Sequence, residues 1–560
     1  MLRSNIDILV NGKRIDLDSE TAIGLSYKGF DFTEPGNFNL NYSNTFTIPL
    51  TNVNRSVFSF PDDMGVNSMV VCQKMYADYD FRLYIDGCFS FSGKLYVSQV
   101  SNGRISLYCI SHKDFTQTMS DVTMFDAADI AIDAINQDIT SKGKSSSFSG
   151  IVDYLSSGDN YAWLPYVVNF LNRTYPYAKL NDNIVSCSNM YDDAEKQDGE
   201  TDAQFEARKN SYDLSNENVL TTELCTDTPV VGDYKTGSIY FSLKLLLENT
   251  FARHGYSISF DADVLSMLQP QYVRMADVCI WEDLLSGKFV LRNDTHSHYK
   301  IGDEAQPSSK SILFLDLFKT FLHEVCGVFD IDEDRNIVVH SLNTIKSIEP
   351  EIMESTEVTN RTMSIDGIPQ QSWIAYSDLA DGSVITGGRK IECHNKNIDK
   401  GGTDKILVGI DRYLTSYLVY MYKDVDQVES ETRAMNNTDT AINDKFVISQ
   451  KMPNDTPYDV TVKRILSGVH TSTADTKLYR AYNLTVSETG FWNIFAQNCM
   501  YPESITVNCR ITSKQASNFS PYNIARFRTI PGLWYITEIS SYNPRLENGT
   551  TSVKAVRIRE

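Results

Sequence analysis

The sequence predicts a β-rich α+β protein of several domains, with small β-barrels or sandwiches beside helix-plus-hairpin modules. Three observations lead to this fold class. Segments that alternate polar and apolar residues recur near both ends of the chain, separated by Asn-Gly and Asp-Gly pairs. Two central segments carry a helical pattern that is followed by a glycine and a strand pattern. The 31 tyrosines and 27 phenylalanines favour strands and contact surfaces.

The length of 560 residues corresponds to roughly three or four domains of ordinary size. Shifts in composition and pattern divide the chain into five regions. We expect an N-terminal β-barrel or sandwich at 1–120, an insertion with a helix and a polar acidic loop at 121–235, α+β helix-hairpin modules at 236–350, a β-rich domain with insertions at 351–480, and a C-terminal β-domain at 481–560.

Turn dipeptides predict a series of hairpins in the first region. Asn11-Gly12, Asp86-Gly87 and Asn102-Gly103 are the pairs that favour two-residue hairpin turns. Pro49, which has no N–H to donate, should end a strand. The predicted strands are Ile6–Val10, Lys13–Leu17, Tyr42–Ile48, Phe81–Ile85, Cys88–Phe91, Lys94–Ser98 and Arg104–Ile110, with Gly93 separating two of them.

The central region predicts two helix-then-strand units. After a helix at 127–139, residues 188–218 are polar and acidic and are expected to form an inserted loop or a short exposed helix. In the first unit, a helix at 239–251 is followed by His254-Gly255 and a strand at 256–260. In the second, a helix at 312–326 is stopped by Gly327, and a hairpin follows with strands at 328–331 and 337–340.

Strand patterns dominate again after about residue 350. The predicted strands are Trp373–Tyr376, Lys405–Ile410, Tyr458–Val462, Leu533–Ile539 and Ser552–Ile558, and Asn548-Gly549 is the expected turn between the last two. A chain that ends on a strand is expected to have its terminus held in a sheet.

Charge and cysteine usage limit the classes of partner. The chain has 72 acidic and 51 basic residues, a net charge of −21, and no block of Lys and Arg, so tight nucleic-acid binding is not expected. An acidic surface suits either solubility before assembly or a channel wall that DNA passes without sticking. Neither an apolar span nor a secretory leader is apparent, and the ten cysteines, without a C-x-x-C pair, are expected to be reduced and structural.

The sequence predicts no catalytic, cofactor-binding or metal-binding residues and therefore no enzyme. G-x-S-x-G, H-E-x-x-H and Walker A motifs are all absent. His296 and His298 could hold a metal, but their Asn-Asp-Thr neighbours are typical of a solvated loop. Residues 330–336 resemble a calcium loop, yet Arg335 and Ser341 occupy the positions that an EF-hand gives to Gly and Glu.

Two further chemical features leave an alternative open. A pair of carboxylates for glycoside hydrolysis could exist among so many acidic residues, although no pair stands out. Phe491-Trp492 and Trp534-Tyr535 could form a sugar platform, but core packing or a subunit contact is the more common role of such pairs. Contact surfaces are expected in the long insertion and around residues 30–41.

Three stretches together resemble a known family, the tail hub or baseplate hub proteins of tailed bacteriophages, including those of crAss-like phages and related prophages. They are the N-terminal segment Tyr42–Arg55 with the hairpin that follows it, the helix-glycine-strand unit seen at 243–260 and 313–340, and the C-terminal segment beginning at Pro531. The stretches cover about the first 110, the middle 100 and the last 70 residues, as domain-sized blocks. They name no catalytic residues.

The resemblance implies a structural virion protein that assembles with itself. Such a subunit would form a homo-oligomeric ring, a trimer or hexamer, that joins tail components and frames the DNA channel. Its partners would be other phage tail proteins and DNA in transit, and it would be assembled in the host bacterial cytoplasm and end in the phage tail. The alternative is a receptor- or glycan-binding tail protein with glycan hydrolase activity.

Overall fold

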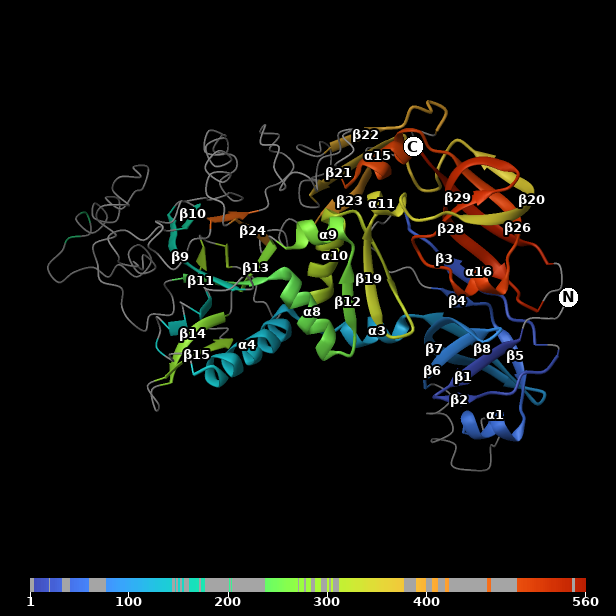
Figure 1. The fold of residues 1–560 in the computed structure, drawn as a ribbon, viewed down its shortest axis with the longest axis horizontal. Helices are drawn as coiled ribbons and strands as arrows, with labels where there is room; N and C mark the ends of the chain where they lie inside the picture. The colour runs from blue at the N-terminus through green and yellow to red at the C-terminus, as the bar shows by residue number, and fades with distance from the viewer. Residues whose placement is uncertain are drawn as a thin grey trace.

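The fold is known from a computed structural model of the chain (Figure 1). It describes residues 5–19, 21–32, 41–59, 77–143, 237–269, 271–275, 278–283, 288–293, 312–376, 389–398, 491–545 and 549–559, several isolated residues and pairs between 147 and 203, and the strand segments 161–170, 173–176, 300–301, 304–305, 405–410, 418–422 and 461–464. The described part is a β-rich α+β protein of several domains, as the sequence predicts.

The N-terminal hairpins form where the turn dipeptides place them. Asn11 (φ 48°) and Gly12 (φ 76°) are both left-handed, and the same conformation recurs at Asp86-Gly87 and Asn102-Gly103, as type I′ turns require. The strands of this region are β1 (Ile6–Val10), β2 (Lys13–Arg14), β3 (Leu25–Lys28), β4 (Tyr42–Ser43), β5 (Phe46–Pro49), β6 (Tyr79–Ile85), β7 (Cys88–Ser101) and β8 (Arg104–Ser111). The predicted strand at 42–48 is therefore split into β4 and β5.

Gly93 does not separate two strands, and the expectation of a break there was wrong. It lies inside the continuous fourteen-residue strand β7. A Cβ atom at this position would lie 2.1 Å from the carbonyl oxygen of Ile110, so the glycine allows β7 and β8 to approach closely. Cys88 is exposed beside the Asp86-Gly87 turn, whereas Cys109 is buried in β8.

The N-terminal strands are continuous with the C-terminal ones in a single thirteen-stranded sheet. Its first strands follow the order β2-β1-β6-β7-β8-β4-β3, with β5 also on β8. β3 then pairs with β28, so that Tyr27 lies opposite Ile539. The C-terminal strands are β20 (Glu351–Thr362), β26 (Ser504–Arg510), β27 (Ile524–Phe527), β28 (Ile530–Tyr542) and β29 (Thr551–Ile558).

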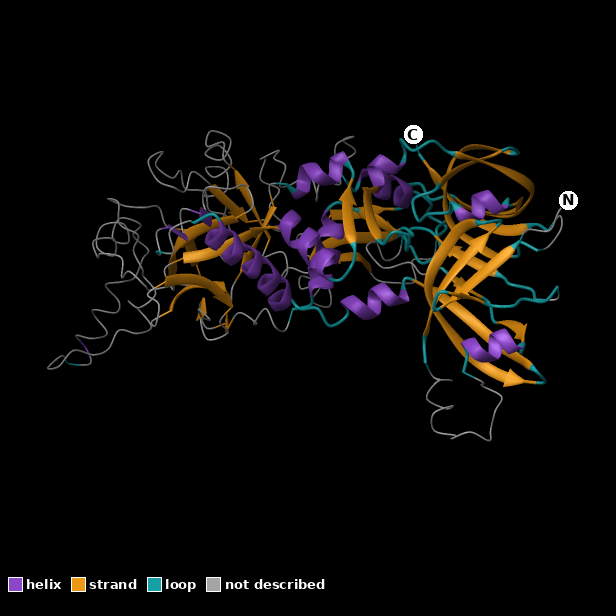
Figure 2. Ribbon diagram, turned by 60° about the horizontal axis from the view of Figure 1, so that its bottom comes forward, coloured by secondary structure: helices purple, strands orange, loops and turns teal. Residues whose placement is uncertain are grey.

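These five C-terminal strands close on themselves. The pairings run β28–β27–β20–β26–β29 and return from β29 to β28. All are antiparallel except β20–β27. Figure 2 shows the resulting small barrel beside the N-terminal strands. The helix α16 (Ser513–Ser517), which has a Thr512–Gln515 capping box, lies beside this barrel, whereas α1 (Asn52–Val57), capped by Thr51, lies beside the N-terminal strands β1 and β2 (Figure 1).

One hydrophobic core runs through both β-regions. Tyr27 is fully buried in it, with its ring 6.0 Å from that of Phe91 and 5.5 Å from that of Phe519. Its hydroxyl lies 2.8 Å from Oγ of Ser90, which satisfies the polar end of a buried phenol. Residues from near both ends of the sequence therefore stabilise the same core.

A helical module adjoins this sheet. Its helices are α3 (Lys113–Met119), α4 (Met124–Ser141), α8 (Leu243–Arg253), α9 (Ala262–Leu268), α10 (Phe314–Glu324), α11 (Leu342–Ile345) and α15 (Asn493–Met500). The strands β12 (Ser257–Phe260), β18 (Gly327–Ile331) and β19 (Asn336–Ser341) form one sheet in the order β12-β19-β18. The predicted hairpin is β18–β19, and the first unit adds β12 to it in parallel.

Two details of these units differ from the prediction. Phe241 lies in a strand, β11 (Gly237–Ser242), and the helix begins only at Leu243. The left-handed residue after α10 is Cys326 (φ 45°), while Gly327 already begins β18. A Cβ at position 327 would lie 2.8 Å from Cδ2 of Leu322, so a larger residue there requires the buried Leu322 side chain to shift.

The remaining strands belong to smaller sheets. β9 (Tyr161–Phe170), β10 (Arg173–Pro176), β11, β13 (Gln271–Met275), β24 (Leu418–Tyr422) and β25 (Thr461–Arg464) form a six-stranded sheet. Two pairs and a triplet complete the set: β14 (Val278–Asp283) with β15 (Lys288–Asn293), β16 (Lys300–Ile301) with β17 (Glu304–Ala305), and β21 (Gln371–Tyr376) with β22 (Arg389–Glu392) and β23 (Lys405–Ile410). The predicted acidic insertion at 188–218 lies outside the described residues, apart from isolated positions.

Aromatic side chains join the module to the barrel. The N–H of Phe30 donates to the hydroxyl of Tyr535 at 2.9 Å, and Phe32 stacks on Phe495 with ring centres 5.9 Å apart. Both phenylalanines are buried, so they do not form the contact surface expected around residues 30–41, of which 33–40 lie outside the described residues. Among the described helices, none combines the length and apolar character needed to cross a membrane.

Candidate interaction surface

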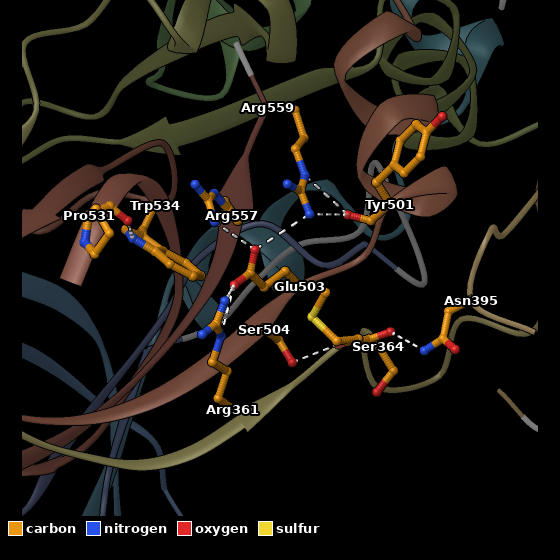
Figure 3. Close-up of polar contacts among 11 residues, drawn as sticks. Arg361, Ser364, Asn395, Tyr501, Glu503, Ser504, Pro531, Trp534, Arg557 and Arg559 are labelled. Carbon is orange, nitrogen blue, oxygen red and sulfur yellow. Dashed lines mark hydrogen bonds and ion pairs between the residues drawn. The ribbon is translucent and has the colours of Figure 1, made fainter. Parts of the chain in front are cut away.

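Glu503 is a carboxylate buried at the edge of the barrel, between α15 and β26. Its side chain is only 2% exposed, yet both oxygens are fully used. Oε1 accepts hydrogen bonds from Nε and Nη2 of Arg361, at 3.0 and 2.6 Å, as Figure 3 shows. Oε2 accepts from Nη1 of Arg557 at 2.9 Å and from Nη2 of Arg559 at 3.4 Å.

These contacts keep Glu503 ionised. Burial acts to raise the pKa of this carboxyl group, but the hydrogen bonds and positive charges of Arg557 and Arg361 outweigh it, and the pKa lies below its ordinary value. Arg361 donates twice to one oxygen, Oε1, and Arg557 and Arg559 bind the other, so charge-assisted hydrogen bonds satisfy the whole carboxylate. One buried charge therefore fixes the positions of three arginines from β20, β29 and the C-terminal residues after it.

The arginines remain open to solvent. The side chain of Arg361 is 62% exposed, and those of Arg557 and Arg559 are 29% and 32% exposed. Three guanidinium groups surround one carboxylate, so this part of the surface carries two positive charges in excess. That excess contrasts with a net charge of −21 for the whole chain.

Apolar and aromatic side chains lie next to the arginines. Tyr501 is 49% exposed, stacks on His394 with ring centres 4.4 Å apart, and has its carbonyl held by Arg559. Met363 follows β20, is 52% exposed, and has its carbonyl held by Asn395 at 2.8 Å. We call the exposed patch formed around Glu503 by Arg361, Met363, His394, Tyr501, Arg557 and Arg559 the Glu503 surface. Figure 3 labels Glu503, its three arginines and Tyr501.

The adjoining strand β20 is exposed along residues 356–361. Ile352 and Val358 on this strand are 63% and 41% exposed. The pairing of β20 with β26 is shifted at two points, between Ser355 and Glu357 and between Val358 and Asn360. Such bulges and charges protect an exposed strand from indiscriminate pairing. A partner is therefore expected to contact this edge of β20 through side chains, not by adding a strand to the sheet.

The residues singled out from the sequence occupy other places. Phe491, Trp492, Trp534 and Tyr535 are each at most 1% exposed, so these aromatic pairs belong to the core and do not form a sugar platform. Residues 332–335 form the turn of the β18–β19 hairpin, with Arg335 left-handed (φ 61°). His296 and His298 lie outside the described residues, and within the described ones no group of His, Cys, Asp and Glu could hold a metal.

The Glu503 surface was not anticipated from the sequence. Arg557 and Arg559 are two residues apart at the end of a strand, which places their side chains on one face, and this spacing was the available signal. Arg361 lies almost two hundred positions away along the chain, on a strand whose pairing with β26 depends on the whole barrel. The convergence of all three on Glu503 is a tertiary feature.

No protein-family model and no curated protein matches the chain. Three solved structures are similar to it at 8% identity. For the 43 kDa tail protein of prophage MuSo2 from Shewanella oneidensis, the match covers 99% of this chain and 98% of that one, with a TM-score of 0.34. For the tail protein from Neisseria meningitidis MC58 the values are 99%, 97% and 0.34, and for prophage tail protein gp18 from Listeria monocytogenes EGD-e they are 98%, 94% and 0.28.

Proposed function

We propose that the chain is a structural subunit of a bacteriophage tail, of hub or baseplate type. In this role it forms a homo-oligomeric ring, a trimer or hexamer, that joins tail components and frames the channel for DNA. It acts by contact with copies of itself and with other tail proteins, without catalysis and without holding DNA tightly. It is assembled in the host bacterial cytoplasm and ends in the virion.

The observation that carries the proposal is the Glu503 surface. Arginine, tyrosine and methionine are enriched at protein interfaces, and contiguous exposed apolar area marks interaction sites. Here arginines held by a buried carboxylate lie beside Tyr501 and Met363, both about half exposed. The N-terminal and C-terminal segments that resemble phage hub proteins meet in the same sheet, through the β3–β28 pairing.

The test is the mass of the purified chain in solution, by multi-angle light scattering across a range of concentrations. A mass of three or six chains, with rings that have a central hole in negative-stain images, supports the proposal and gives its symmetry. A compact monomer at high concentration contradicts the ring as a property of the isolated chain. Among the described residues, no specific observation favours the receptor- or glycan-binding alternative, because the aromatic pairs that suggested a sugar platform are buried.

A further inference from the structure

The Glu503 surface has the chemistry of a contact that recognises carboxylates. Guanidinium groups bind carboxylates in a fixed, two-pronged geometry, and those held in place lose little entropy on binding. Glu503 holds Arg361, Arg557 and Arg559 in that state, and their exposed atoms face solvent. Tyr501 and Met363 add apolar area at the side. The complement is therefore a protein face with several carboxylates and some apolar area.

Helix α4 presents such a face on the same chain. Asp126, Asp129 and Asp133 are exposed at a spacing of three and four residues, which places them in one row along the helix. Asp126 also accepts hydrogen bonds from Thr123, and Asp129 accepts one from Asn293. The helix contains no Lys or Arg from Met124 to Ser141. Its apolar residues, including Ala131, Ile132 and Ile135, are buried on the other side. The exposed Ala134 lies on the flank of this row, about 100° around the helix from Asp133.

The two complementary faces of one molecule do not meet. In Figures 1 and 2, α4 lies on the far side of the α8–α10 module from the barrel that carries the Glu503 surface. A contact between them must therefore join two copies. A contact between two different faces is head-to-tail, and repetition of a head-to-tail contact gives a ring when the rotation closes.

We propose that the Glu503 surface of one copy binds the acidic face of α4 on a second copy, and that this head-to-tail contact builds the assembly. The inference rests on the proposed function and names the two faces of its subunit contact. A nucleic acid is the less suitable occupant, since the patch has only two positive charges in excess, and the chain as a whole repels phosphate.

The test is a charge exchange read by sedimentation velocity. Arg361→Glu and Asp133→Arg should each weaken association on the order of 100-fold, as loss of a desolvated charge contact does. The double variant Arg361→Glu with Asp133→Arg restores opposite charges across the contact and should recover most of the association. Raising the salt concentration should weaken the wild-type assembly, because partly exposed charges are screened.

Controls separate a lost contact from a lost fold. Met363→Asp alters the surface without touching Glu503 and should weaken association too, with an unchanged circular dichroism spectrum. Lys13→Glu makes the same change of charge as Arg361→Glu at an exposed position of β2 and should leave association unaltered.

Each outcome decides something different. Association that none of Arg361→Glu, Asp133→Arg and Met363→Asp affects overturns this contact and leaves the proposed ring standing. Single variants that weaken association, with a double variant that does not recover it, overturn α4 as the partner face. Binding of a single-stranded oligonucleotide that Arg361→Glu abolishes would assign the surface to nucleic acid instead. A wild-type chain that remains a monomer at high concentration contradicts both the ring and this contact as properties of the isolated chain.

Discussion

Tyr84 donates a hydrogen bond to Oε1 of Glu333 at 2.8 Å, although 249 residues separate them in the sequence. Tyr84 lies on β6 of the N-terminal sheet, and Glu333 lies in the turn of the β18–β19 hairpin. Nη1 of Arg82 is 3.6 Å from the same carboxylate oxygen, and Nε2 of His112 is 3.8 Å from Oδ1 of Asp330 on β18. The hairpin is thus attached to the N-terminal region by a small set of polar contacts.

Removal of the Tyr84 hydroxyl should weaken this attachment slightly. Tyr84→Phe loses one hydrogen bond to a charged, partly exposed acceptor, so we expect the free energy of unfolding to fall by about 0.5–1 kcal/mol. The measurement is the midpoint of urea unfolding followed by circular dichroism. Tyr108→Phe is the matched control, because Tyr108 is also a tyrosine of the N-terminal sheet, on β8, and its ring stacks on that of Tyr96. It should change the midpoint less. If both variants lost the same free energy of unfolding, the hydrogen bond to Glu333 would make no specific contribution to stability.

Asp330 makes the stability of the chain depend on pH near neutrality. Burial, helped by the nearby charge of Asp332, raises the pKa of Asp330 to about 7, although the N–H of Ile331 acts in the opposite direction. In the unfolded chain this carboxyl group loses its proton at a much lower pH, so between about pH 4 and 7 the folded state binds the proton more tightly than the unfolded state. The free energy of unfolding therefore falls as the pH rises from about 4 towards 7.

Asp330→Asn should remove that dependence. The amide stays neutral at every pH. Above pH 7 the free energy of unfolding of the variant should therefore exceed that of the wild type by on the order of 2 kcal/mol, and this difference should vanish near pH 4. Unfolding curves at pH 4, 5.5, 7 and 8 measure it, with Asp334→Asn, an exposed neighbour, as control. A variant that is less stable than wild type at pH 8 would show that the polar contact of Asp330 with His112 prevails over burial.

Glu503 should contribute much more to the free energy of unfolding than an exposed acidic residue of the same barrel does. Glu503→Gln leaves three arginines around a neutral group, and loss of one member of a buried charge cluster costs about 3 kcal/mol. Since the pKa of Glu503 is lowered, its contribution is present at neutral pH and is lost as pH falls below the ordinary range of a carboxyl group.

The matched variant is Glu354→Gln. Glu354 contacts Arg528 at 2.9 Å, but both side chains are more than half exposed, and we expect a cost below about 0.5 kcal/mol. Denaturant unfolding at pH 7 and at pH 4 compares the two. The role assigned to Glu503 fails if both variants lose the same stability, or if the loss in Glu503→Gln is as large at pH 4 as at pH 7.

The sequence predicts the local parts of this fold well, because their causes are local. Asn11-Gly12, Asp86-Gly87 and Asn102-Gly103 form the expected turns, since only their own backbone conformation matters. The β18–β19 hairpin follows for the same reason. The β3–β28 pairing does not, because it depends on a core shared by residues more than five hundred positions apart. The Glu503 surface is beyond local reasoning in the same way, since Arg361 reaches it only through the barrel.

Gly93 offers the sharpest test of the packing between β7 and β8. Its pattern suggested a turn, but the reason for glycine is a backbone contact, since an added Cβ would lie 2.1 Å from the Ile110 oxygen. Gly93→Ala must push the strands apart at a point where Leu95 and Cys109, paired just beyond it, are buried. We expect the free energy of unfolding to fall by about 2–3 kcal/mol, which is typical of overpacking. The measurement is the midpoint of thermal or urea unfolding. Ser92→Ala, one residue away, is the control and should cost far less. If Gly93→Ala proved as stable as wild type, the close approach of β7 and β8 at Gly93 would be wrong, and the glycine would owe its place to backbone flexibility alone.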